Sequence, residues 1–231
     1  METRANAIPD IGSRRELFVD NFLLERLNGA RLKLHEPKPG GIAIRYDTPW
    51  EGYPDNPRSF YTTVLKDGDT YRMYYRGGYD PLNVNNCYAE SVDGASWSKP
   101  KLGLVEVEGS TANNVILLSG RICPFIDGRP GVRAAERYKA NALGRTPAGK
   151  VGLFGYVSGD GIHWTKLGDE LIVASELENH LDSQNVMFWA EAEERYVLYA
   201  RHMEGGRRAT ARATSDDFVS WTKPTLMTYS D

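Results

Sequence analysis

The stretch Ser158-Gly159-Asp160-Gly161-Ile162-His163-Trp164 is the strongest indication of the fold, because it recurs in the chain. Ser91-Val92-Asp93-Gly94-Ala95-Ser96-Trp97 precedes it, and Ser215-Asp216-Asp217-Phe218-Val219-Ser220-Trp221 follows it. All three copies read Ser-x-Asp-x-x-x-Trp, and their tryptophans lie 67 and 57 residues apart. Repeats of roughly 40 to 50 residues are typical of β-propeller blades, and loops account for longer steps.

Each residue type in the motif has a structural purpose. Aspartate accepts hydrogen bonds from backbone amides in a tight turn, and glycine, which follows it in the first two copies, adopts positive φ without strain. The tryptophan can then pack across the blade. The motif is therefore interpreted as a structural turn and not as a catalytic group.

The repeat extends beyond the motif. A tyrosine-bearing strand is expected before each copy, at 71–76, 137–142 and 195–201. A second strand ends in the serine of each copy, at 86–91, 152–158 and 208–215. Antiparallel strands in this order, without a convincing long helix, predict an all-β chain of the β-propeller class.

Composition narrows the function classes. The chain has 231 residues, of which 41% are hydrophobic and 11% aromatic, enough for a sizeable core. The net charge of −3 and the lack of a basic stripe argue against nucleic acid, and no apolar run is long enough for a membrane span. Cys87 and Cys123 are too few for a zinc site, and they are expected as free buried thiols, with a single disulfide between them as the alternative.

The start of the chain leaves localisation open. Residues 1–10 are polar and lack the apolar segment of a signal peptide. The protein is therefore expected either in the cytoplasm or outside the cell with its signal absent.

Four segments are expected. Residues 1–41 form a lead-in with a hairpin, in which Asn28-Gly29 turns the chain into a strand at 30–35. Residues 42–118, 119–178 and 179–231 form blades one to three, with the last strand of blade one at 104–107 and a loop at 124–131. Three blades rarely close a ring, since propellers usually have four to eight, so the chain is expected to be an N-terminal fragment.

Carboxylates recur before the tyrosine-bearing strands. Asp182 lies 14 residues before Tyr196, and Asp127 lies 11 residues before Tyr138. In blade one the candidates are Asp55 and Glu51. If these loops open at one end of the ring, the carboxylates meet in a central cleft. Paired carboxylates suit the hydrolysis of glycosidic bonds, in which one acts as acid and another as base or nucleophile.

Further side chains are candidates for contacts with a carbohydrate substrate. Those expected to hydrogen-bond sugar hydroxyls are Arg76, Arg129, Gln184, Asn185 and Arg201. Trp50 and Trp189 could stack on a sugar ring or simply pack in the core. No organic cofactor or protein partner is implied, and a structural calcium ion at the axis stays open without a motif that identifies it.

Several segments resemble a known family. They are 15–23, 49–52, 71–77, 127–131 and 182–185. These segments are similar to bacterial proteins described as glycoside hydrolase family 32-like. The resemblance covers nearly the whole chain, and it implies the five-bladed propeller of β-fructosidases and arabinanases in families 32, 43 and 68.

The resemblance also implies roles for the carboxylates. By position, Asp127 corresponds to the transition-state stabiliser, Asp182 to the general acid, and Glu51 or Asp55 to the base or nucleophile. The chain departs from the fructosidase motifs: Asp127 is followed by Gly128-Arg129-Pro130 where an Arg-Asp-Pro motif is expected, and no Glu-Cys or Asn-Asp-Pro-Asn-Gly motif occurs. The resemblance thus implies a glycosidase acting on a plant or algal oligo- or polysaccharide, while β-fructosidase specificity does not carry over with the missing motifs.

Two alternatives remain open from the residues. A carbohydrate-binding propeller without catalysis would account for the missing fructosidase motifs. A structural or protein-interaction propeller would use the carboxylates only in turns, where aspartate is common for local reasons.

Overall fold

The computed structural model describes residues 10–13, 16–18, 23–52, 61–78, 84–175 and 181–228. The chain divides into two units, Met1–Gly41 and Ile42–Asp231. The described residues of the first unit contain neither helix nor strand, and Leu34 is 96% exposed. The expected strand at 30–35 is therefore wrong, because a lone hairpin with no sheet to cover its apolar side chains is marginally stable at best.

The described residues of the second unit form three antiparallel sheets, one after another along the chain. The first sheet contains β1 (Thr63–Asp67), β2 (Thr70–Gly77), β3 (Val84–Ser91) and β4 (Val115–Ser119). The second contains β5 (Ile122–Ile126), β6 (Tyr138–Arg145), β7 (Val151–Ser158), β8 (Thr165–Lys166) and β9 (Val173–Ala174). The third contains β10 (Val186–Ala190), β11 (Arg195–Glu204), β12 (Arg207–Ser215) and β13 (Thr225–Leu226).

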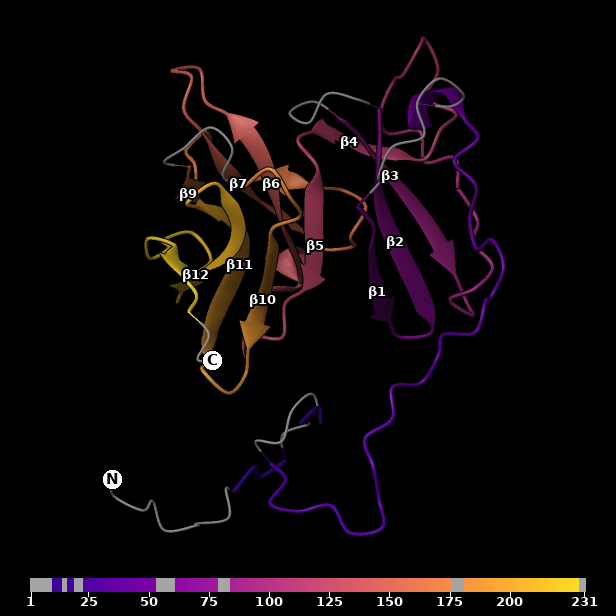
Figure 1. Ribbon diagram of the computed structural model, residues 1–231. Helices are drawn as coiled ribbons and strands as arrows, with labels where there is room; N and C mark the ends of the chain where they lie inside the picture. The colour runs from indigo at the N-terminus through magenta and orange to yellow at the C-terminus, as the bar shows by residue number, and fades with distance from the viewer. Residues whose placement is uncertain are drawn as a thin grey trace. The chain divides into compact units, whose positions relative to one another are not determined.

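The first strand of each sheet lies beside the first strand of the next. Figure 1 shows β5 between β1 on one side and β10 on the other, and these strands contact one another. We call β1, β5 and β10 the inner strands. The helices in the described part are the 3₁₀ turns η1 (Pro49–Glu51) and η2 (Ala134–Glu136), and none is long and apolar enough to cross a membrane.

The tyrosine-bearing strands and those that end in the motif serine are confirmed. Two other expectations are wrong. Residues 104–107 form no strand, and β4 completes the first sheet instead. The loop expected at 124–131 begins later, because Pro124 lies within β5. As the first strand of its sheet, β5 has no ladder partner on one side, so the missing N–H of a proline is tolerated there.

The three Ser-Asp-Trp motifs form the same turn. In the second copy, Ser158 Oγ donates to Asp160 Oδ1 at 3.0 Å, and Oδ1 also accepts the backbone N–H groups of Ile162 at 2.9 Å and His163 at 2.8 Å. The other two copies repeat these bonds. The interpretation of the motif as a structural turn is confirmed.

The third copy reaches the same backbone without glycine. Gly94 and Gly161 have φ of 73° and 76°, and Phe218, in the same position, has φ of 72°. Positive φ strains a bulky residue. Phe218 is fully buried against Phe125 and Tyr196, and this packing offsets the strain.

Aromatic side chains fill the space between neighbouring sheets. Tyr74 and Tyr88 of the first sheet pack with Phe154 and Tyr156 of the second in one buried cluster. Phe125 of the second sheet packs with Tyr196 of the third in another. The sheets are thus joined face to face by hydrophobic burial.

A carboxylate also joins each sheet to the next. Asp67, at the end of β1, accepts the hydroxyl of Tyr138, and Asp127, directly after β5, accepts that of Tyr196 at 2.6 Å. These two contacts are equivalent, because Tyr138 and Tyr196 each pair with the serine of their own motif. We call them the blade latches.

Acid is expected to weaken the first latch. The hydrogen bond from Arg137 holds the pKa of Asp67 well below its ordinary value of 3.8. A depressed pKa contributes stability that is fully present above the unfolded value and is lost as the pH falls through the folded value. We expect Asp67→Asn to flatten the decline in unfolding free energy below about pH 4, measured by urea unfolding across that range. Asp169→Asn, which removes the same charge from a 95% exposed side chain, is the control, and equal slopes for both variants would contradict the prediction.

Candidate functional site

Polar side chains from all three sheets meet where the inner strands begin. Thr63 starts β1, Cys123 is the second residue of β5, and Gln184 lies just before β10. Gln184 Nε2 donates to Thr63 Oγ1 at 2.8 Å and lies 3.4 Å from Cys123 Sγ, which is 3.8 Å from Thr63 Oγ1. We call this end of the three strands the inner-strand site.

Asp182 and Arg201 form an ion pair at the same end of the third sheet. Arg201 Nη1 lies 2.7 Å from Asp182 Oδ2, and the Asp182 side chain is 55% exposed. The register places them together, because Val186 pairs with Tyr199 and Arg201 follows two residues later. Asp182 thus presents an accessible carboxylate beside Gln184.

Arginines of the first two sheets share one aromatic ring. The Arg121 guanidinium lies 4.1 Å from the centre of the Tyr61 ring, and that of Arg76 lies 5.9 Å away. Arg121 Nη2 also donates to the backbone oxygens of Asp182 at 3.1 Å and Ser183 at 2.7 Å. Burial lowers the pKa of Arg121, and the Arg76 charge acts in the same direction. This end of the site therefore carries buried positive charge.

Glu51 lies in a closed network of its own. Its carboxylate accepts the hydroxyl of Tyr75 at 2.6 Å and the N–H of Thr48 at 3.0 Å, and it lies 2.8 Å from Lys99 Nζ. Its side chain is fully buried. These contacts cap η1 and fix it to the first sheet, so the geometry gives Glu51 a structural role.

Asp127 is equally enclosed. Its side chain is fully buried between Lys139 Nζ at 2.7 Å and the hydroxyl of Tyr196. The expectation that it precedes the innermost strand of its blade is wrong, because 122–126 form that strand and Asp127 follows it. Asp127 and Asp182 therefore lie at opposite ends of the inner strands, and a five-residue strand separates those ends by about 13 Å.

Arg129 and Trp189 come together beside Asp127, away from the inner-strand site. They line an open pocket of about 450 Å³ with Glu191 and Glu194. The Arg129 guanidinium lies 5.5 Å from the centre of the Tyr196 ring, and the Trp189 ring meets the same tyrosine edge-on at 5.1 Å. The structure thus unites two of the expected sugar contacts, but at the far end.

The remaining candidates are accounted for individually. Trp50 Nε1 donates to Asn114 Oδ1 at 2.7 Å, and its ring packs in the first sheet's core. The Asn185 amide donates to the backbone oxygens of Leu181 at 2.9 Å and Ser183 at 3.1 Å, which shapes the turn before β10. Asp55 lies outside the described residues.

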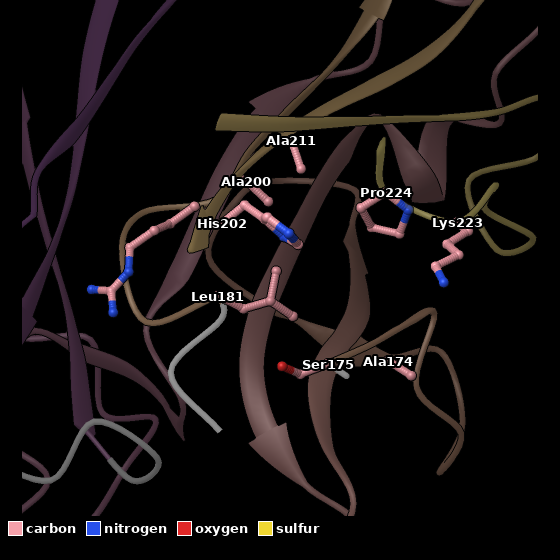
Figure 2. Close-up of a pocket in the computed structure, with 9 residues that line it drawn as sticks. Ala174, Ser175, Leu181, Ala200, His202, Ala211, Lys223 and Pro224 are labelled. Atoms are coloured by element: carbon pink, nitrogen blue, oxygen red, sulfur yellow. The ribbon is translucent and has the colours of Figure 1, made fainter. Parts of the chain in front are cut away.

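A small cavity lies beside Arg201 on the side of the third sheet. It measures about 20 Å³, and Figure 2 shows Leu181, His202 and Ser175 among its lining side chains. This volume suits a single water molecule, whereas sugar-sized ligands need several hundred Å³. The cavity is a packing gap between the second and third sheets and not the sugar site itself.

The cysteines of the described residues are buried and are not suited to act as nucleophiles. Burial raises the pKa of the Cys123 thiol and that of Cys87, so both are neutral and poor nucleophiles. Both are free, as the sequence predicts. Among the described residues, no group of three or more His, Cys, Asp and Glu side chains is placed to hold a metal ion.

Sequence reasoning missed Arg121, Tyr61, Thr63 and Cys123. The available signal was Ser119-Gly120, which separates two apolar runs and marks the break between β4 and β5. Placing that break correctly makes Arg121 the residue before an inner strand, and the register gives it the position that Gln184 has in the third sheet.

No protein-family profile matches the sequence, and no curated protein matches it either. Solved structures do. The chain is similar to a fructofuranosidase from Schwanniomyces occidentalis complexed with fructosylnystose, with a TM-score of 0.54 and 12% identity over 81% of this chain and 38% of the enzyme. It is also similar to a family 117 glycoside hydrolase of the marine bacterium Zobellia galactanivorans, with a TM-score of 0.53 and 13% identity over 80% of this chain and 50% of that protein.

At these identities the likeness concerns the fold. The expected all-β propeller fold is confirmed: the described sheets have the architecture of β-propeller glycoside hydrolases. The chain spans only 38% and 50% of the length of these two proteins.

Proposed function

We propose that this chain carries a carbohydrate-binding site where the inner strands begin. The observation that carries the proposal is the convergence of Thr63, Cys123 and Gln184, one from each sheet, through contacts of 2.8 to 3.8 Å. In a propeller, the innermost strands of all blades line one central axis. Side chains where these strands begin can therefore contact the same ligand. The fold shared with glycoside hydrolases supports a carbohydrate as that ligand.

The polar groups at this end suit sugar hydroxyls. The Gln184 amide and the Thr63 hydroxyl offer both donors and acceptors, and the exposed Asp182 carboxylate accepts. Arg201 and Arg76 surround them with further donors. Such convergent groups fix the orientation of a ligand in a binding site.

Hydrolysis of the bound glycan is the second candidate, and the position of Asp182 favours it. We propose Asp182 as the general acid, which gives its proton to the glycosidic oxygen as the bond to the anomeric carbon breaks. A second carboxylate must activate water or attack the anomeric carbon. We assign this role to Asp55, since Glu51 and Asp127 are enclosed in structural networks.

A single pair of variants tests both candidates. Oligosaccharide binding by the full chain is measured by calorimetry, and cleavage products are separated by anion-exchange chromatography. We expect Asp182→Ala to weaken binding through loss of a hydrogen bond to the sugar, about 3- to 10-fold. If the chain hydrolyses its ligand, Asp182→Asn should lower the rate at least about 100-fold.

Asp169→Asn is the matched control, because it removes the same charge from an exposed side chain on the second sheet. Binding without cleavage would support a binding propeller and refute hydrolysis. Absence of any glycan binding by the folded chain would refute the proposed function.

Arg129 and Trp189 remain proposed as sugar contacts in the separate pocket at the far end. A half-buried indole beside a guanidinium and two carboxylates can stack on a pyranose and bind its hydroxyls. Binding at this pocket would leave Asp182 variants unaffected.

A further inference from the structure

We propose that Arg121 binds an anionic group of the glycan, either a carboxylate or a sulfate ester. This inference rests on the proposed function and narrows it to acidic carbohydrates. It starts from the burial of the Arg121 side chain, an observation separate from the hydrogen bonds that suggest a sugar.

Arg121 is buried, and the Asp182 carboxylate acts on its charge from beyond ion-pair distance. The residue is 6% exposed, and no carboxylate in the described part of the chain forms an ion pair with it. Its recorded partners are the backbone oxygens of Asp182 and Ser183 and the face of the Tyr61 ring. Carbonyl groups and an aromatic ring offset only part of the cost of burying a full charge. An anion at this position would complete the compensation.

The Arg76 guanidinium lies near that of Arg121. Arg76 is also buried, at 9% exposure, and its guanidinium lies over the same tyrosine ring. The Asp182 carboxylate, which could serve as the counter-ion, is directed to Arg201 at 2.7 Å. The Asp182 carboxylate is thus already paired with another guanidinium.

The guanidinium keeps donors available for a ligand. Its recorded hydrogen bonds to the protein both leave from Nη2, whereas Nε and Nη1 have no recorded acceptor among the described residues. Nε–H and Nη1–H are donors that a planar carboxylate or a sulfate can take. The Nη2 bonds hold the guanidinium in place, so little flexibility is lost on binding.

The experiment compares acidic and neutral oligosaccharides on the full chain. The probes are oligogalacturonides for carboxylates, carrageenan oligosaccharides for sulfate esters, and agarose and β-galactan oligosaccharides as their neutral counterparts. We expect an acidic series to bind more tightly than its neutral counterpart and to weaken with added salt. The series that binds identifies the anionic group.

Variants connect the preference to Arg121. We expect Arg121→Gln to weaken binding of the acidic series about 10- to 100-fold while leaving neutral binding within about 3-fold. Arg133→Gln, at a side chain that is 78% exposed, is the matched control and should leave both series unchanged. Arg121→Lys keeps the positive charge but loses the planar guanidinium, so its affinity for the acidic series should lie between those of the wild type and Arg121→Gln. If Arg121→Gln does not fold, Arg121→Lys is used in its place.

The outcomes separate this inference from the proposed function. Neutral oligosaccharides that bind as tightly as acidic ones, or an equal loss of both series in Arg121→Gln, would overturn the anion site and leave the carbohydrate site standing. Failure of every series to bind the folded wild type would overturn both.

Discussion

Replacing Gly120 with alanine is expected to lower the free energy of unfolding by at least about 3 kcal/mol, the upper end of the cost of overpacking. Gly120 lies between β4 and β5, where the chain passes from the first sheet to the second. A Cβ atom there would lie 1.6 Å from the backbone oxygen of Leu143 and 2.7 Å from its carbonyl carbon. Leu143 is held in β6 by pairing with Leu153, so its backbone cannot move aside without loss of the sheet.

Gly128→Ala is the matched control for this change. A Cβ atom at Gly128 would meet only the Trp189 ring at 3.8 Å, an ordinary contact distance. Urea unfolding of the two variants should differ by more than about 2 kcal/mol, since surface substitutions outside special sites cost about 0.5 kcal/mol or less. Equal stabilities would show that Gly120 and Leu143 of β6 do not approach as closely as described.

Asp127→Ala is expected to cost about 3 to 5 kcal/mol of unfolding free energy, because it leaves the Lys139 ammonium buried without a partner. The Lys139 side chain is 3% exposed, and its Nζ lies 2.7 Å from the carboxylate. The variant also breaks the second blade latch, in which Tyr196 donates to Asp127 at 2.6 Å. Chemical unfolding at neutral pH measures the loss.

Two further variants test whether the loss of stability comes from the buried, unpaired charge of Lys139. Asp169→Ala breaks an exposed pair with Lys166 and should cost less than about 1 kcal/mol. Asp127→Leu combined with Lys139→Met replaces the buried pair by apolar groups and should recover much of the lost stability. An Asp127→Ala variant that unfolds at the same urea concentration as the wild type would contradict this prediction.

The elements predicted correctly are those whose signals are local. The Ser-Asp-Trp turns depend on hydrogen bonds within seven residues, so a single sequence contains all the information they need. β6, β7 and β10 have long apolar or aromatic patterns between clear turns. β5 was missed because Pro124 and the following Asp127-Gly128 indicate a loop, and only the tertiary arrangement shows that β5 is the first strand of its sheet.

The site was predicted in part for the same reason. Asp182 was named from its place in the repeat, and Gln184, Arg76 and Arg201 were named as polar side chains that could contact a sugar; all four lie at the inner-strand site, and their roles stay predictions. The burial of Glu51 could not be foreseen, because its partner Lys99 is 48 residues away. Arg121 was missed together with the start of β5, since the position of a side chain in a sheet follows from the register.

The blade latches imply an order of assembly during synthesis. In both latches the carboxylate belongs to the earlier sheet and the tyrosine hydroxyl to the later one. A ribosome releases the chain from its N-terminus, so each acceptor is already in place when its donor emerges. Each new sheet can therefore pack against an earlier sheet that is already folded. The first sheet places the Asp67 carboxylate through β1, without any residue of a later sheet. Ala190 takes the equivalent position in the third sheet. Its methyl group cannot accept a hydrogen bond, so this position cannot form a blade latch.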